Sequence, residues 1–468
     1  MATYTVANLA DVFGSTAWSF DGSSFLIGTA GVGIVIGGAT GGDIANSVNL
    51  TGGYYINGTS IFASPQFTGT VNATVGYTIG GTSIFASPAL TGTPTAPTAS
   101  AGTNTTQLAT TAFVQANSGG SANKLCNPFC DIDQANEGAT VVLTSNTPTY
   151  IIDGCKADFV AAGAAVSAQR STNAPTGFPN SLELIVTTGG TLAAGAFAVL
   201  QQPIEGADLI DTAFGTASAQ PLAVSFWFTA TIAGVYSGAI QNAAFTRSYP
   251  FNFTLASANV WQLFTVTIPG DTSGTWVTSG ASAGMYLTIC GSGGSTFQST
   301  VNTWAGGNFF ATSSNTNSLI TTTGAQMFLG PRRLGIGTSS PPIARQSFES
   351  DLSFCQRYYE KSYNLGTALG TVTSVGCASF ELQASSSVLE QFGMQFFFAV
   401  KKRATPTCAT YSTVTGTVNK VADLTDASDR TPSYGAQGQS GFFAVASPAP
   451  NPTAFLSMQA HWTADARP

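Results

Sequence analysis

The first 123 residues carry almost no charge, and this feature restricts the possible folds of the chain more than any other. They contain three aspartates, Asp11, Asp21 and Asp43, and no lysine, arginine, glutamate or histidine. An isolated domain with so few charges would have little charge repulsion to keep it soluble and to prevent it from associating. We therefore expect this segment to pack against copies of itself or against another protein.

An internal repeat lies inside this uncharged segment. The run Tyr54–Pro65 (YYINGTSIFASP) recurs as Tyr77–Pro88 (YTIGGTSIFASP), at an offset of 23 residues, and each copy continues into Thr-Gly-Thr. Repeats of this length are typical of stacked units that cannot bury an apolar face alone. Two copies are too few for a free-standing solenoid, so three chains wound together would supply the missing neighbours. The alternative is an ordinary tandem duplication within a linker.

Several segments resemble bacteriophage proteins. Residues 88–114 (PALTGTPTAPTASAGTNTTQLATTAFV) closely resemble the repeat of phage tail-fibre shafts. Residues 352–362 (LSFCQRYYEKS) look like a segment in the distal parts of many phage virion proteins, and the C-terminal residues 461–468 resemble the end of the same proteins. Residues 334–341 (LGIGTSSP) are similar to a turn motif of phage fibres. The resemblance implies a homotrimeric fibre subunit, with an attachment segment at 1–50 and a shaft at 51–123.

A short helix is predicted near the end of this shaft. Thr105 or Thr106 can serve as its N-cap, and Asn117–Ser121 ends it and provides a hinge. The helix is too short to be stable alone in water, but a bundle of three chains would bury its apolar stripe. The residues that we expect to pack in the trimer are Leu108, Ala112, Phe113 and Ala116.

Residues 124–345 predict a jelly-roll or β-sandwich domain. In residues 224–229 (VSFWFT) and 264–268 (FTVTI) apolar and polar side chains alternate, and the second run stops at Pro269 and Gly270. Period-two patterns bounded by proline and glycine indicate strands, and many short strands with Gly/Ser turns suggest a sandwich. Residues 268–276 (IPGDTSGTW) also look like a loop of carbohydrate-binding-type jelly-roll domains in phage proteins.

Residues 346–468 predict a helix followed by a small β-rich tip. Phe348, Leu352, Cys355 and Tyr359 recur at helical spacing, with acidic residues near the start and Arg357 and Lys361 near the end, as the helix dipole favours. We expect this amphipathic helix to dock on the sandwich, in preference to Tyr358 and Tyr359 forming a binding pair. Residues 395–400 (QFFFAV) predict a buried strand.

Composition excludes several classes of function. Charged residues make up 8 % of the chain and the net charge is −7, without the clustered lysine and arginine that nucleic-acid binding requires. The most apolar early stretch is broken by glycines and far shorter than a membrane span, and the N-terminus lacks the pattern of a signal peptide. The missing export signal predicts assembly in the host cytoplasm, and the resemblance to phage fibres implies a final location in the virion tail.

The spacing of the cysteines and the glycine-rich loop give no indication of a bound cofactor. The seven cysteines, an odd and scattered set, favour buried free thiols over a disulfide framework. Cys126 and Cys130 lie far from the single histidine, His461, which argues against zinc. The glycine loop at 291–294 lacks a following lysine, which excludes a P-loop.

Catalytic chemistry is not indicated, although carboxylates are present. Three groups are close enough in sequence to test: Asp131 with Asp133; Glu205 with Asp208 and Asp211; Asp423 with Asp426 and Asp429. A glycosidase needs two carboxyls that flank the scissile bond, and the Glu205 group could instead bind calcium or be a solvated turn. With His461 as the single histidine and no strained nucleophile elbow, a Ser-His-Asp enzyme is not expected.

Binding of a bacterial surface glycan is the function that these observations favour. Flat aromatic rings bordered by polar side chains suit the apolar face and polar rim of a sugar. Trp276 and Trp304 lie in loop-like surroundings and are the candidate contacts, whereas Trp227 and Trp261 occupy strand patterns and are assigned to the core. The expected partners are further copies of the chain, other tail or baseplate proteins and the glycan. The alternatives are a virion protein without a receptor role (collar, baseplate or head fibre) and a polysaccharide depolymerase.

Overall fold

A computed structural model describes residues 122–315, 317, 319–340, 342–383, 391–447 and 455–468, with short pieces of the first 121 residues. The chain divides into two units, Met1–Pro94 and Thr95–Pro468. The predicted packing residues Leu108, Ala112, Phe113 and Ala116 lie outside the described residues, so the predicted bundle stays a prediction.

The internal repeat of the first unit corresponds to a repeated hairpin. In the first copy β3 (Tyr55–Ile56) pairs with β4 (Thr59–Ser60), and in the second β5 (Thr78–Ile79) pairs with β6 (Thr82–Ser83). The register is equivalent, because Tyr55 faces Ser60 as Thr78 faces Ser83. The two residues between the strands, Asn-Gly in one copy and Gly-Gly in the other, are those that tight hairpins favour. Another hairpin pairs β1 (Trp18–Phe20) with β2 (Phe25–Ile27).

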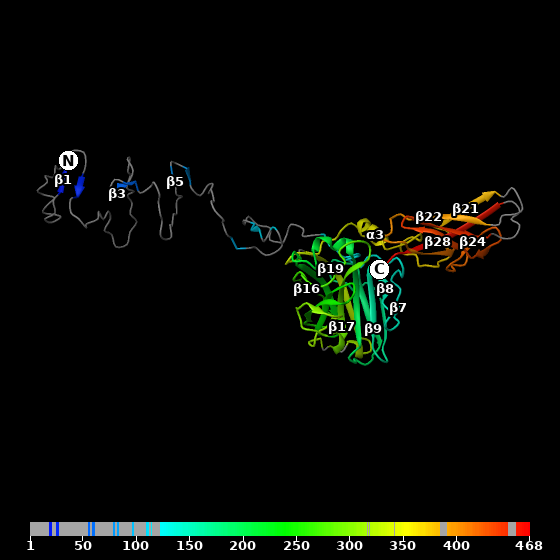
Figure 1. Cartoon of the computed structure of the whole chain (residues 1–468), viewed down its shortest axis with the longest axis horizontal. Coiled ribbons are helices and arrows are strands. Elements are labelled where there is room, and N and C mark those ends of the chain that lie inside the picture. The colour runs from blue at the N-terminus through cyan, green and yellow to red at the C-terminus, as the bar shows by residue number, and fades with distance from the viewer. Residues whose placement is uncertain are drawn as a thin grey trace. The chain divides into compact units, whose positions relative to one another are not determined.

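Two antiparallel sheets form a β-sandwich in the second unit, which confirms the prediction of a mainly β fold (Figure 1). The six-stranded sheet has the order β16 (Gln262–Ile268), β13 (Leu222–Ala230), β19 (Gln326–Ile336), β11 (Ser181–Thr188), β10 (Ala165–Ser171), β7 (Val141–Val142). The seven-stranded sheet has the order β18 (Ala305–Gly306), β15 (Arg247–Leu255), β14 (Gly234–Asn242), β17 (Ala283–Gly293), β12 (Phe197–Glu205), β9 (Cys155–Val160), β8 (Thr149–Ile152). The 3-10 helices are η1 (Gly206–Thr212), η2 (Ser295–Phe297) and η3 (Leu319–Thr321).

Aromatic side chains from both sheets fill the sandwich core. Phe226 and Phe228 of β13 are fully buried, as the alternating pattern predicts. Each ring centroid lies 5.0 Å from that of Phe253 on β15. Edge-to-face contacts of this kind contribute more than area burial alone, so β13 and β15 hold the two sheets together.

The chain itself covers part of the outer face of the seven-stranded sheet. We call residues 294–315, in the connection from β17 to β19, the strap. Phe297 and Phe310 of the strap pack against Val199 and Cys290, which point away from the core. Asn308 Oδ1 of the strap accepts a hydrogen bond of 2.7 Å from Gln241 Nε2 of β14. The strap therefore satisfies polar groups on this face that would otherwise meet water.

The predicted C-terminal helix is present but shorter than its pattern. Helix α3 (Phe348–Gln356) begins after Ser347, whose side chain accepts a hydrogen bond from Ser350 N. The expectation that Tyr359 and Lys361 belong to the helix is wrong, because both lie in β20 (Tyr359–Lys361), which pairs with β28 (Phe455–Asp465). Pairing with the long strand β28 provides the hydrogen bonds that a further helical turn would have made.

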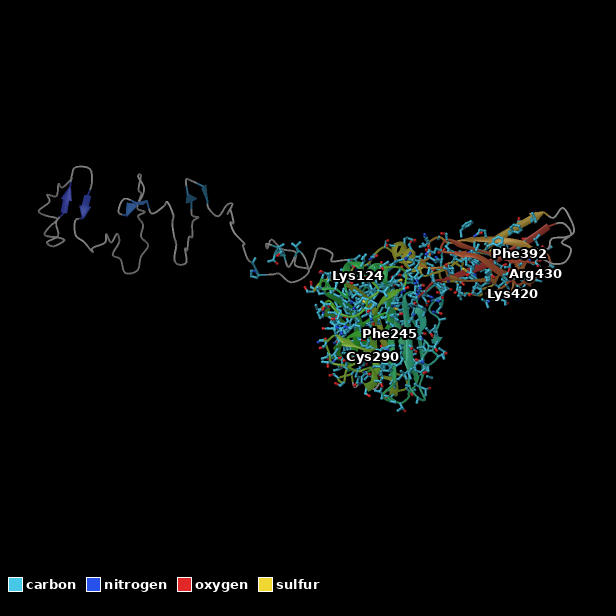
Figure 2. The ribbon with its side chains drawn as sticks, viewed as in Figure 1. Lys124, Phe245, Cys290, Phe392, Lys420 and Arg430 are labelled. Carbon is cyan, nitrogen blue, oxygen red and sulfur yellow. The ribbon has the colours of Figure 1, made fainter. Side chains whose placement is uncertain are left out.

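The distal β region (residues 359–468) contains two further sheets (Figures 1 and 2). In the first, β28 pairs with β20, β21 (Ala378–Gln383), β23 (Thr407–Ser412) and β24 (Val421–Asp423), and β24 pairs with β25 (Ser428–Arg430). The second has the order β22 (Phe392–Phe397), β27 (Gly441–Ala446), β26 (Ser433–Gly438). The prediction of a buried strand at 395–400 is only partly right: β22 ends at Phe397, and on this edge strand Phe396 is buried whereas Phe397 is 74 % exposed.

The sandwich and the distal β region meet at a largely polar junction. Glu205, at the end of β12, accepts hydrogen bonds from Arg357 Nη2 (2.6 Å) and from the hydroxyl of Tyr358 (2.9 Å). Gln134 Nε2 donates to the carbonyl of Tyr359 (2.7 Å). Tyr358 and Tyr359 are buried in this junction, which agrees with docking of the helix and excludes an exposed pair of tyrosines.

One carboxyl near this junction is incompletely satisfied. Asp153 lies in the turn between β8 and β9, where Oδ2 accepts from Gln134 N (2.9 Å) and Oδ1 has no hydrogen-bond partner. Burial, with a smaller contribution from nearby Asp133, raises the pKa of Asp153 to about 7, against the opposing effects of the hydrogen bond from Gln134 and the charge of Arg467. The charged form is therefore disfavoured in the folded protein.

We predict that stability decreases as the pH rises from about 4 to about 7. In this range folded Asp153 keeps a proton that the unfolded chain releases, so each rise in pH favours unfolding. The contribution is about 2–4 kcal/mol. Urea unfolding should show a weaker pH dependence for Asp153→Asn than for wild type, whereas Glu381→Gln, at an exposed position of β21, serves as the control. Equal pH dependence in wild type and Asp153→Asn would contradict the prediction.

Candidate functional site

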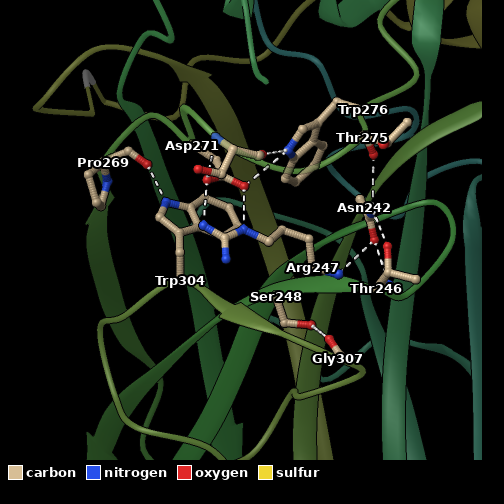
Figure 3. Close-up of polar contacts among 11 residues, drawn as sticks. Asn242, Thr246, Arg247, Ser248, Pro269, Asp271, Thr275, Trp276, Trp304 and Gly307 are labelled. Atoms are coloured by element: carbon tan, nitrogen blue, oxygen red, sulfur yellow. Dashed lines mark hydrogen bonds and ion pairs between the residues drawn. The ribbon is translucent and has the colours of Figure 1, made fainter. Parts of the chain in front are cut away.

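Two predicted contact residues come together on loops at one end of the sandwich. Trp276 lies in the connection between β16 and β17, and Trp304 lies directly before β18 (Figure 3). Their ring centroids are 5.6 Å apart and the rings meet edge to face at 84°. Both side chains are half-buried, so each presents only part of its ring to solvent. We call Trp276 and Trp304 the tryptophan pair.

Two core aromatic residues support the tryptophan pair from below. Phe214 is buried, and its ring meets Trp276 at 4.9 Å and Trp304 at 5.8 Å, in both cases edge to face. Tyr249 of β15 lies 5.1 Å from Trp304. The tryptophan pair is thus an extension of the sandwich core to the surface, and its rings are held by packing from more than one direction.

A buried carboxylate holds the loop that carries Trp276. The side chain of Asp271 is 1 % exposed and forms a bidentate pair with Arg247, at 2.7 Å to Nε and 2.8 Å to Nη2. Its oxygens also accept from Trp276 Nε1 (3.1 Å) and from Ser273 N (3.2 Å). A carboxylate can be buried at low cost when its lone pairs are satisfied in this way. The hydrogen bond to Asp271 also raises the pKa of Arg247 above its ordinary value.

Both indole N–H groups are bound within the protein. Trp276 Nε1 donates to Asp271 and to the carbonyl of Ser273 (3.2 Å), and Trp304 Nε1 donates to the carbonyl of Pro269 (2.9 Å). The guanidinium of Arg247 lies over the Trp304 ring, 5.7 Å from its centroid. The pair can therefore offer a ligand its ring surface but not its N–H groups.

The loop that carries Trp276 is also hydrogen-bonded to the turn between β14 and β15. Asn242 Nδ2 donates to the carbonyl of Thr275 (3.0 Å), and Asn242 Oδ1 accepts from the backbone N–H groups of Thr246 and Arg247 (Figure 3). Gly274 has a φ of +80°, and a Cβ at this position would lie 3.3 Å from Arg247 Cγ. Glycine is thus required where the loop crosses the arginine stem.

Hydroxyl and amide side chains border the tryptophan pair. The exposed neighbours in sequence are Thr272, Ser273, Thr275, Asn302 and Thr303. An apolar ring surface next to hydrogen-bonding side chains is chemically suited to a sugar. In the described part of the chain, no group of acidic, histidine or cysteine side chains could hold a metal ion.

Trp227 and Trp261, which the strand patterns assign to the core, are instead half-buried on the outer face of the six-stranded sheet. Trp227 lies between Phe226 and Phe228, which face the core, so strand alternation turns it outward. Trp261 Nε1 donates to Asn173 Oδ1 (3.2 Å). The alternation of β13 was the signal that could have placed Trp227 correctly.

Most of the carboxylates considered for catalysis have structural partners, although Asp429 Oδ1 is buried without one. Glu205 binds Arg357 and Tyr358, and Arg430 binds both Asp423 (3.1 Å) and Asp426. Other members of these groups have partners of the same kind: Asp133 accepts from backbone N–H groups, Asp131 pairs with Arg345 and Asp211 with Lys124. Within the described residues no helix is long and apolar enough to cross a membrane.

Comparison with known proteins gives only remote likenesses. No protein-family model matches the sequence, and no curated protein matches it. The enzymatically active domain of tailspike protein 4 from bacteriophage CBA120 is similar at 13 % identity and a TM-score of 0.24, over 46 % of this chain and 21 % of that one. This chain thus spans about a fifth of that protein.

Two carbohydrate-binding modules are similar at the same remote level. TmCBM61, solved with β-1,4-galactotriose, has 11 % identity and a TM-score of 0.22 over 46 % of this chain and all (100 %) of that one. The family 11 module of Clostridium thermocellum, solved with a β-1,3-1,4-mixed-linked tetrasaccharide, has 11 % identity and a TM-score of 0.22 over 43 % of this chain and 97 % of that one. Likeness of this strength places no ligand in the present chain.

We predict that Asp271→Asn loosens the loop of the tryptophan pair. The substitution removes the charge that binds Arg247 and leaves the arginine without its bidentate acceptor, which should lower the free energy of unfolding by about 2–3 kcal/mol. Tryptophan fluorescence during urea unfolding measures stability, and its emission maximum reports the average environment of the six tryptophans, of which Trp276 is one. Glu381→Gln, at an exposed position of β21 in the distal β region, is the control. An unchanged unfolding midpoint and emission maximum in Asp271→Asn would contradict the role assigned to this carboxylate.

Proposed function

We propose that this chain is a structural subunit of a bacteriophage tail fibre that recognises a bacterial surface glycan without cleaving it. The observation that carries the recognition role is the tryptophan pair, oriented by Asp271 and Arg247 and bordered by exposed hydroxyl and amide groups. The resemblance of residues 88–114 to tail-fibre shafts and the uncharged, repeated N-terminal segment support the fibre role.

In this proposal the chain is a homotrimer joined to other tail or baseplate proteins through its N-terminal segment. It assembles in the host cytoplasm, a reducing compartment in which cysteines stay free. The seven cysteines are free thiols, all buried except the half-buried Cys377, which is consistent with that origin. The structural partners of Glu205, Asp423 and Asp426 favour binding over hydrolysis, because these carboxylates stabilise the fold.

We predict that Trp276→Ala and Trp304→Ala each weaken glycan binding about tenfold or more, because a buried aromatic contact often dominates a binding surface. The assay measures binding of the labelled full chain to purified lipopolysaccharides and capsular polysaccharides. Trp276→Phe, which keeps a flat ring and loses the N–H group, should retain most of the binding. Trp261→Ala is the matched control on the six-stranded sheet.

The outcomes of this assay separate the alternatives. Loss of binding in Trp261→Ala alone would place the glycan on the outer face of the six-stranded sheet. A wild-type chain that binds no surface polysaccharide would favour a virion protein without a receptor role. Release of reducing ends from the polysaccharide, abolished by substitution of a carboxylate, would indicate a depolymerase.

We also predict a trimer in solution, with a mass about three times the 47.8 kDa of one chain. Light scattering of the full chain measures it. Leu108→Asp would place a charge in the predicted apolar stripe and should shift the mass towards that of one chain, because burying an unpaired charge is costly. Gln107→Asp, on the opposite side of the predicted helix, should leave the trimer intact. A wild-type monomer would exclude the intertwined shaft.

A further inference from the structure

Two cysteines on different structural elements place their sulfur atoms in contact. Cys126 belongs to the segment that enters the sandwich, and Cys355 belongs to α3, 229 residues further along the chain. Their Sγ atoms lie 3.6 Å apart in a small apolar cluster with Ile132 and Tyr358. Among the described residues this is the one sulfur–sulfur contact, because Cys130 and Cys155 face Arg332 and Cys290 faces Asn315.

Both cysteines are held in place by their own surroundings. The carbonyl of Cys126 accepts from Gln202 Nε2 of β12 (2.5 Å), and the carbonyl of Cys355 accepts from Tyr358 N (2.9 Å) at the end of α3. A Cβ at Gly154 would lie 2.9 Å from Cys126 Cβ, so the other side of Cys126 is also closely packed. The contact is thus set by the packing of α3 on the sandwich.

The two thiols differ in their access to small molecules. Cys355 is fully buried, whereas Cys126 is 5 % exposed and lines a crevice of about 10 Å³ with Tyr150, Pro203 and Arg467. This volume is about that of one water-sized molecule. Burial also raises the pKa of Cys355 well above its ordinary value. Cys126, which lines this crevice, is therefore closer to solvent than Cys355, and it is assigned as the first sulfur to be oxidised with Cys355 as the resolving neighbour.

We propose that Cys126 and Cys355 are a latent oxidation site, which hydrogen peroxide converts to a disulfide that joins the sandwich to α3. In the first step the Cys126 thiol and hydrogen peroxide give a sulfenic acid and one water. In the second step the Cys355 sulfur attacks the sulfenic sulfur, the S–O bond breaks, and the hydroxyl leaves with the Cys355 proton as a second water. Two thiols are oxidised by two electrons and the peroxide is reduced.

The bond would link the elements that the junction already brings together. Glu205, Arg357 and Tyr358 hold α3 to the sandwich by hydrogen bonds and an ion pair, and a covalent bond would add a link that water cannot displace. Closing so long a segment restricts the unfolded chain, which is the usual source of disulfide stabilisation. The thiols stay reduced in a cytoplasm and oxidise in an aerobic medium. This inference does not depend on the proposed function.

The test treats the full chain with hydrogen peroxide, alkylates the remaining thiols after denaturation, and maps the peptides by mass spectrometry. The expected product is a peptide pair joined through Cys126 and Cys355, with five of the seven thiols still alkylated. A denaturing gel without reductant should show the mass of one chain. Oxidation should raise the melting temperature by about 5 °C or more, and a thiol reductant should reverse the change.

Variants separate the two steps. Cys355→Ser should stop the reaction at the Cys126 sulfenic acid, which dimedone traps, and should abolish the shift in melting temperature. Cys126→Ser should give no adduct at Cys355. Cys377→Ser, which removes the half-buried thiol, should oxidise like wild type. If Cys126 and Cys355 both stay alkylatable, or if Cys126 proceeds to a sulfinic acid while Cys355 stays free, the proposal is wrong.

Discussion

The fully buried guanidinium of Arg332 is the interaction on which the sandwich most depends. Arg332 lies on β19 of the six-stranded sheet, and its Nε donates to Gln202 Oε1 (2.6 Å) on the seven-stranded sheet. Its Nη atoms contact the sulfurs of Cys130 (3.1 Å) and Cys155 (2.7 Å) and the carbonyl of Asn127 (3.4 Å). One side chain thus joins both sheets and the entering segment. Removing any partner would leave a buried charge poorly solvated, which proteins tolerate badly.

Arg332 and its partner Gln202 also contact the buried cysteines. A soft sulfur is an unusual acceptor for a guanidinium, and Arg332 opposes the rise that burial causes in the pKa of Cys155, which is nevertheless raised to about 12. Gln202 connects the two groups, because its amide donates to Cys126 and its carbonyl accepts from Arg332. The cysteine pair and the arginine are therefore parts of one buried network that leads from the sheet interface to α3.

The sequence predicted the parts of the fold that depend on local patterning. Alternation identified β13 and β16, and apolar spacing with an N-cap identified α3. The end of α3 could not be predicted, because it depends on pairing of β20 with β28, about one hundred residues further along the chain. The strap was missed for a similar reason: Asn308 and Phe310 become structural only against side chains of distant strands.

The candidate site was predicted in part. Loop composition singled out Trp276 and Trp304, but nothing in the sequence showed that the two would touch or that Asp271 and Arg247 would hold them. Trp227 shows the converse, because the alternation of β13 already placed it on the side opposite Phe226 and Phe228, and the assignment to the core overlooked this local pattern. Contacts between residues distant in sequence account for the first result alone.

The strap determines which surfaces of the sandwich can be altered without disturbing the fold. The strap covers part of the outer face of the seven-stranded sheet. Substitutions at this contact would therefore disturb both the strap and the strands beneath it. The loop that carries Trp276 lies outside the strap and has a support of its own, in which Asp271 and Arg247 hold the backbone while the hydroxyl groups of Thr272, Ser273 and Thr275 stay exposed. Substitutions at the exposed side chains of this loop can therefore alter the surface beside Trp276 without disturbing the strap or the strands beneath it.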